Sequence, residues 1–179
     1  MNTITEPMCR GEFVDGFIQA VVEISPAFER KIRDVLAENG IEEPRAGETY
    51  PADYVIDSIN QLAEDVGPKT TTRIAVNQIR IPDWPEGIDD VEQALDASDD
   101  MYRGAYIDFD RDRLGAFRFE KTGAGRGRGA VTEDFPYPEA FAEGIFEGTL
   151  KEFTSESSLP TVSETETRAD EKAAFELRW

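Results

Sequence analysis

The sequence contains no histidine and only one cysteine, Cys9. Without histidine the chain lacks the commonest general base, the base of a Ser-His-Asp triad and the commonest metal ligand. One cysteine allows neither an intrachain disulfide nor a cysteine-rich metal site. Cys9 has only Arg10 beside it as a basic group that could activate a thiolate, so we expect no catalytic thiol.

Lysine is scarce, and positive charge as a whole is outnumbered. Lysine and arginine total 19 against 38 aspartates and glutamates, which gives a net charge of −19. A dense carboxylate surface holds water in strong salt, whereas in dilute buffer its charges repel one another. We interpret this as the haloarchaeal type of composition found in halophiles. The alternative is an acidic protein of a mesophile that has a cationic partner. The charge also argues against nucleic acid or an anionic membrane as a partner.

The chain has no apolar run of transmembrane length, and its first residues lack the pattern of a signal peptide. We therefore expect a soluble, cytoplasmic protein without membrane insertion. Its length suits a flexible N-terminus over residues 1–12 followed by a single domain over 13–179.

Helical periodicity dominates the N-terminal half. Apolar residues at helical spacing predict helices over residues 26–39, 51–66, 70–81 and 90–102, with Ser25 and either Asp89 or Asp90 as caps. The dense apolar segment 13–24 fits a helix slightly better than a strand.

Alternation typical of strands appears only after residue 104. Residues 105–109 and 115–120 predict a hairpin connected by 110–113, and residues 159–165 and 173–179 predict a second one. Between them lie a glycine-rich loop, 122–129, and a helix, 138–153. The sequence therefore predicts an α+β fold, in which N-terminal helices pack on a four-stranded antiparallel sheet with a central helix between two β-hairpins.

The central helix carries two glycines on one face, Gly144 and Gly148, which are four residues apart. Each costs about 0.5–1 kcal/mol relative to alanine inside a helix. The simpler interpretation is close packing of this face on another element. The alternative is that the glycines open space for a ligand beside Phe141 and Ile145.

Aromatic residues gather in the sheet segments and around the central helix. They supply an ordinary aromatic core or, alternatively, the lining of an apolar ligand pocket. The predicted ligand-binding residues are Tyr102, Phe117, Phe119, Tyr137, Phe141, Ile145 and Trp179.

Two charged motifs offer weaker sites. Asp108, Asp110 and Asp112 have the spacing of the first EF-hand ligands, but Arg113 and Phe119 stand where that loop needs glycine and glutamate. An acidic turn is the simpler explanation, so we expect no metal. In the glycine-rich segment, Arg126 and Arg128 are candidates for an anion or partner contact, while a flexible loop is the simpler interpretation.

Several short motifs of the second half occur together: Tyr102-Arg103-Gly104, Pro136-Tyr137-Pro138, Gly144 to Gly148, and Phe175 to Trp179. They resemble a sensor-domain superfamily that contains the 4-vinyl reductase domain, the haem-dependent nitric-oxide-binding domain and the TRAPP subunits, and most resemble an uncharacterised branch abundant in myxobacteria. The resemblance implies ligand sensing or protein interaction, often in dimers. Related domains often carry a cysteine where this chain has Ala173, and the haem-binding ones use a proximal histidine, which is absent here.

We therefore expect a non-enzymatic small-molecule-binding or sensory domain of a halophile, a homodimer with a small apolar ligand, an unidentified protein partner and no cofactor. Two alternatives stay open. One is a TRAPP-like scaffold or assembly subunit without a ligand, and the other is an enzyme that uses buried carboxylates.

Overall fold

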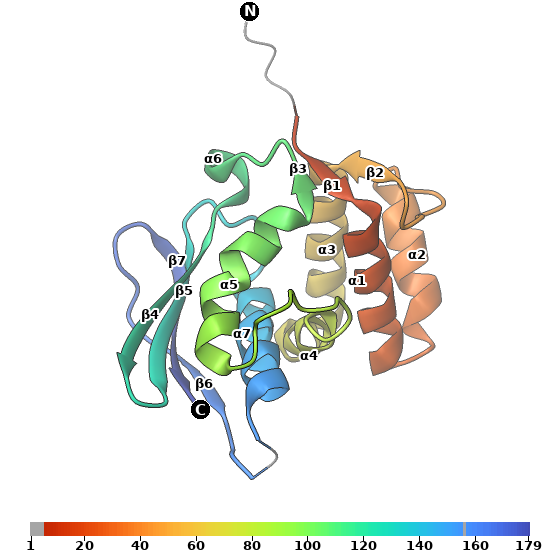
Figure 1. Cartoon of the computed structure of the whole chain (residues 1–179). Coiled ribbons are helices and arrows are strands. Elements are labelled where there is room, and N and C mark those ends of the chain that lie inside the picture. The colour runs from red at the N-terminus through yellow and green to blue at the C-terminus, as the bar shows by residue number, and fades with distance from the viewer. Residues whose placement is uncertain (1–5, 156) are drawn as a thin grey trace, which may run out of the picture.

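The computed structural model describes residues 6–155 and 157–179. Over these residues the chain forms seven helices and seven strands, arranged in two antiparallel sheets (Figure 1). The helices are α1 (Gly11–Ile24), α2 (Phe28–Glu38), α3 (Ala52–Val66), α4 (Pro68–Gln78), α5 (Val91–Gly104), α6 (Arg111–Leu114) and α7 (Glu139–Phe153). The strands are β1 (Met8–Arg10), β2 (Thr49–Pro51), β3 (Tyr106–Ile107), β4 (Phe117–Gly123), β5 (Arg126–Thr132), β6 (Thr161–Glu164) and β7 (Glu171–Arg178). The predicted α+β class is confirmed.

The larger sheet has the strand order β4-β5-β7-β6 and lies on one side of the molecule (Figure 1). Helices α5 and α7 lie between this sheet and the group formed by α1 to α4. The buried core extends through the layer formed by α5 and α7, because α7 buries residues toward both the large sheet and α4.

The start of α5 shows how local sequence sets a helix boundary. The carboxylate of Asp90 accepts a hydrogen bond from the backbone N–H of Gln93 at 2.9 Å, as an N-cap residue does. Helix α1 covers residues 13–24, the segment in which the sequence favoured a helix only slightly over a strand. In the described part of the chain, no helix is both long and apolar enough to cross a membrane.

The first predicted hairpin was wrong. Residues 106–107 do form a strand, but β3 pairs with β1 rather than with the segment near 117. The predicted connection is the short helix α6, which Asp110 caps by accepting from the N–H of Asp112 at 3.0 Å. Strand β1 is central to the small sheet β2-β1-β3, so Met8–Arg10 is ordered within the segment predicted to be flexible; residues 1–5 lie outside the described residues.

The true partner of β4 is β5, which occupies much of the segment predicted as a glycine-rich loop. The glycines of β5 fit the sheet because aromatic rings lie over them. A methyl group added to Gly129 would lie 2.7 Å from the ring of Phe146, and one added to Gly127 would meet the ring of Phe119. Among the glycines of the predicted loop segment, Gly125 has a positive φ of +62°, and the tight turn there requires glycine for its backbone conformation.

Helices α4 and α7 approach each other through the two glycines of α7. A methyl group on Gly144 would lie 2.6 Å from Cβ of Ala75, and one on Gly148 would lie 2.9 Å from the carbonyl oxygen of Val76. Close packing, the simpler of the two interpretations, therefore explains both glycines. They face α4 and not an open space.

Candidate functional site

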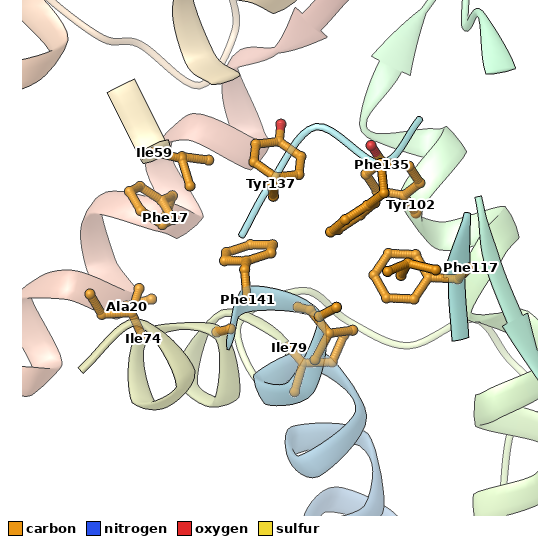
Figure 2. Packing of buried hydrophobic residues seen from close by; sticks show 14 of the residues in the cluster. Phe17, Ala20, Ile59, Ile74, Ile79, Tyr102, Phe117, Phe135, Tyr137 and Phe141 are labelled. Carbon is orange, nitrogen blue, oxygen red and sulfur yellow. The ribbon is translucent and has the colours of Figure 1, made fainter. Parts of the chain in front are cut away.

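An apolar cavity of about 90 Å³, partly open to the surface, lies where the helices meet the large sheet. Phe141 and Ile145 of α7, Tyr102 of α5 and Phe117 of β4 form much of its wall. Figure 2 shows Phe141, Tyr102 and Phe117 directed from three different elements toward the same interior region. The remaining wall residues are Phe13, Gln78, Ile79, Pro82, Ser98, Met101 and Ala105.

A wider groove of about 450 Å³ adjoins this cavity. Five residues line both spaces, so the groove leads to the cavity: Phe13, Gln78, Pro82, Met101 and Ala105. The outer part of the groove is charged and contains Arg10, Glu12 and Asp83. The arrangement is an apolar inner chamber with a partly polar entrance, as small-molecule sites commonly have.

Four of the seven predicted ligand-binding residues, Tyr102, Phe117, Phe141 and Ile145, line this cavity. Tyr137 lies directly behind them, fully buried, with its ring centre 5.2 Å from that of Phe141. Helical and strand periodicity placed the four wall residues on inward faces, and the fold brings those faces together.

Phe119 and Trp179 lie elsewhere. Their rings pack on each other with centres 6.1 Å apart, at the end of the sheet near the β4-β5 turn, and neither lines the cavity or the groove. Phe119 covers Gly127, and the backbone of Trp179 pairs with Gly125. Their aromatic pairing closes one end of the sheet.

The two arginines of the glycine-rich segment have different surroundings. Arg128 forms a bidentate ion pair with the buried carboxylate of Glu171, with Nη1 2.7 Å from Oε1, and it also donates to the carbonyl oxygen of Glu166. This pairing lowers the pKa of Glu171 from its usual 4.5 to about 2. Arg128 therefore joins β5 to β7, while Arg126 is exposed on the same strand.

Two tyrosine hydroxyls meet behind the cavity, where Tyr106 and Tyr137 share a hydrogen bond. Burial raises the pKa of both hydroxyls well above the usual value, so both are neutral. The ammonium group of Lys172 donates to the carbonyl oxygens of Phe135 and Tyr137 at 2.9 and 2.7 Å. These bonds fix the extended segment that carries Tyr137 into the core.

Sequence reasoning missed Gln78, which lines both the cavity and the groove. Its side chain is 6% exposed, and its Nε2 donates to the carbonyl oxygen of Phe13 at 3.4 Å. Its Oε1 is buried without a hydrogen-bond partner among the described residues. The available signal was a polar residue within the inward stripe of α4 formed by Ile74, Ala75 and Ile79.

The acidic motif around Asp110 does not form a metal site in the described part of the chain, where no group of three or more carboxylate or cysteine residues is placed to hold an ion. Asp108 takes a positive φ of 53° at a bend, and Asp110 caps α6. The spacing of Asp108, Asp110 and Asp112 thus reflects a turn and a short helix.

No family model matches the sequence, and the search of curated proteins found no match. The fold, in contrast, matches solved structures of H-NOX proteins. An unliganded Fe(II) H-NOX protein from K. algicida superposes with a TM-score of 0.65 at 16% identity, covering 94% of this chain and 95% of the other. An H-NOX protein from S. oneidensis in the Fe(II)NO state gives 0.64 at 12%, covering 94% and 98%.

An oxygen-binding H-NOX domain related to soluble guanylate cyclases gives a TM-score of 0.62 at 14% identity, and it covers 94% of this chain and 93% of that domain. At such identities the comparison establishes architecture and not ligand. The chain therefore has the fold of the H-NOX proteins. The superfamily that the sequence motifs resemble includes the haem-dependent nitric-oxide-binding domain.

Proposed function

We propose that this chain is a non-enzymatic, small-molecule-binding domain of sensory type that holds a small, mainly apolar ligand in the cavity. The cavity itself carries the proposal, because it is lined by aromatic and aliphatic side chains and leads outward through a partly polar groove. The fold shared with H-NOX proteins supports a sensory role by analogy, although fold alone does not determine function.

Haem, the group named for solved structures of the H-NOX family, does not fit the residues present. The chain has no histidine, and the thiol of Cys9 is fully buried in β1, outside the cavity wall. Burial also raises the pKa of that thiol, which disfavours the thiolate needed for ligation. The hydroxyl of Tyr102 already donates to the carbonyl oxygen of Leu114 at 2.7 Å. A chamber of about 90 Å³ is also far smaller than the roughly 300–1,000 Å³ of sites for drug-sized ligands.

The size of the cavity suits a ligand of a few heavy atoms. An engineered apolar cavity of about 150 Å³ in another protein stays dry and binds benzene or xenon. Here a ring could enter the chamber of about 90 Å³ with part of its volume in the adjoining groove. A bound ligand would contact α4, α5 and α7 at once and would stabilise their packing. This change in stability is the signal that a sensor domain could pass to a partner or a second copy.

Titration with toluene, followed by backbone amide NMR, tests this proposal. Ala105 lines both chamber and groove, so Ala105→Leu should fill their junction and abolish the shifts. Ala37→Leu makes the same change at an exposed position of α2 and should leave binding intact. Saturable shifts in the native chain and Ala37→Leu, but not in Ala105→Leu, are expected. Absence of saturable shifts in the folded native chain would refute the proposal.

The two other hypotheses gain less support. A scaffold subunit would use an exposed apolar face, but the large exposed hydrophobic side chains of the described residues are only Tyr54 and Leu159, on separate segments. An enzyme acting through buried carboxylates would need an acid of raised pKa in a cleft. Glu171 is the one buried carboxylate of the described chain, and its ion pair with Arg128 lowers its pKa.

A further inference from the structure

We propose that Gln78 selects the ligand by accepting a hydrogen bond through Oε1, so that the ligand is a small apolar molecule carrying one O–H or N–H group. This inference rests on the proposed function, since it names the ligand class of the same cavity. It assigns to Gln78 the role of a specificity-determining residue.

The orientation of the Gln78 amide follows from its neighbours. Nε2 points to the carbonyl oxygen of Phe13, and rotation of the amide by half a turn would place Oε1 against that oxygen instead. At the same end of the amide, a methyl group on Gly16 would lie 3.2 Å from Nε2, so α1 encloses Nε2 closely at a position where glycine leaves room. The amide oxygen is therefore held as the unpaired end.

An amide oxygen that is buried without a partner destabilises a folded protein, because it has lost its hydrogen bonds to water. Gln78 lines the chamber and the groove, while its Oε1 has almost no accessible surface of its own, so a small turn of the side chain on binding would bring Oε1 to the missing donor on a bound molecule. The cost of the unpaired oxygen is then relieved only when a ligand with a donor is present. An acceptor-only ligand of the same shape gains nothing from this oxygen.

The other polar groups of the chamber wall strengthen this selection. Ser98 donates its hydroxyl hydrogen to the carbonyl oxygen of Ala94 at 3.1 Å, and Tyr102 donates to Leu114. Both hydroxyl hydrogens are therefore already used within the protein. Of these three side chains, Gln78 alone has a buried polar atom without a partner.

Phenol and toluene form a suitable probe pair, because they share a shape and differ in one O–H group. Their dissociation constants should be measured for the native chain, for Gln78→Met, which keeps the length of the side chain without its amide, and for Gln19→Met. The last variant is the control, since Gln19 is exposed on α1. Comparing ratios between variants cancels the different hydration of the two probes.

We expect the preference for phenol over toluene to fall about tenfold in Gln78→Met, in the range of one lost hydrogen bond, and to stay unchanged in Gln19→Met. If both probes bind but Gln78→Met leaves the ratio unchanged, the inference is overturned while the proposed function stands; an ordered water that serves Oε1 equally well would give this result. If neither probe binds the folded native chain, the proposed function fails and the inference fails with it.

Discussion

Replacing Gly144 with alanine tests the packing of α7 on α4, which positions Phe141 and Ile145 at the cavity. The added methyl group would lie 2.6 Å from Cβ of Ala75 and would also meet the backbone of Thr72. Because the second obstacle is a helix backbone, rotation of a side chain cannot relieve the contact. The two helices must move apart.

The magnitude follows from two opposing effects. Overpacking of a well-packed contact costs about 1–3 kcal/mol, while alanine regains about 0.5–1 kcal/mol over glycine in a helix. We expect a net loss of about 1–2 kcal/mol in the free energy of unfolding, which for a chain of this size lowers the midpoint of thermal unfolding by about 2–8 °C.

Urea unfolding followed by circular dichroism measures this loss. Gly104→Ala is the matched control, because Gly104 ends α5 and an added methyl group there meets nothing within 4 Å. It should be neutral or stabilising. If Gly144→Ala is as stable as the native chain, or gains stability as the control does, the argument for a close α4–α7 contact is refuted.

Three further predictions concern charge and capping. Glu171→Gln should cost about 2–3 kcal/mol at neutral pH, because Arg128 loses its buried partner. The folded-state pKa of Glu171 is lowered from 4.5 to about 2, so the stability that the ion pair contributes is complete above pH 4.5 and is lost as the pH falls toward 2. Urea unfolding should therefore show the free energies of unfolding of the native chain and the variant converging between these pH values. A difference that stays constant with pH would contradict the role given to this ion pair. Asp90→Ala should cost about 1 kcal/mol through loss of the α5 cap, and an unchanged urea midpoint would contradict it. Multimolar KCl should raise the thermal midpoint, because it screens a net charge of −19; a midpoint that falls or stays level would count against halophilic adaptation.

Periodicity and capping allowed much of the fold to be predicted. The helical stripe of α3, the Asp90 cap and the α7 glycines are local signals, and the final β6-β7 pair carries the alternation of a half-buried strand. These features depend on residues close in sequence. The same is true of the cavity wall on α5 and α7, since Tyr102 and Phe141 lie on the inward faces of predicted helices.

The errors arose where a distant partner decides the structure. Strand β3 is only two residues long, and it exists because β1, nearly a hundred residues earlier, pairs with it. The glycines of strand β5 led to its prediction as a loop. Glycine occurs there because aromatic rings pack directly over the strand and leave no room for a side chain. Gln78 was missed for a similar reason, because its unpaired oxygen is visible only once α1 and α4 are placed side by side.

Anomalous diffraction from a crystal of the native chain under xenon pressure shows whether the chamber accepts a small apolar guest, because xenon enters dry apolar cavities. We expect one ordered xenon atom among Tyr102, Phe141 and Ile145, and its loss in Ala105→Leu. A chamber that stays empty while xenon occupies other sites, or one that contains haem in the purified protein, would contradict this expectation.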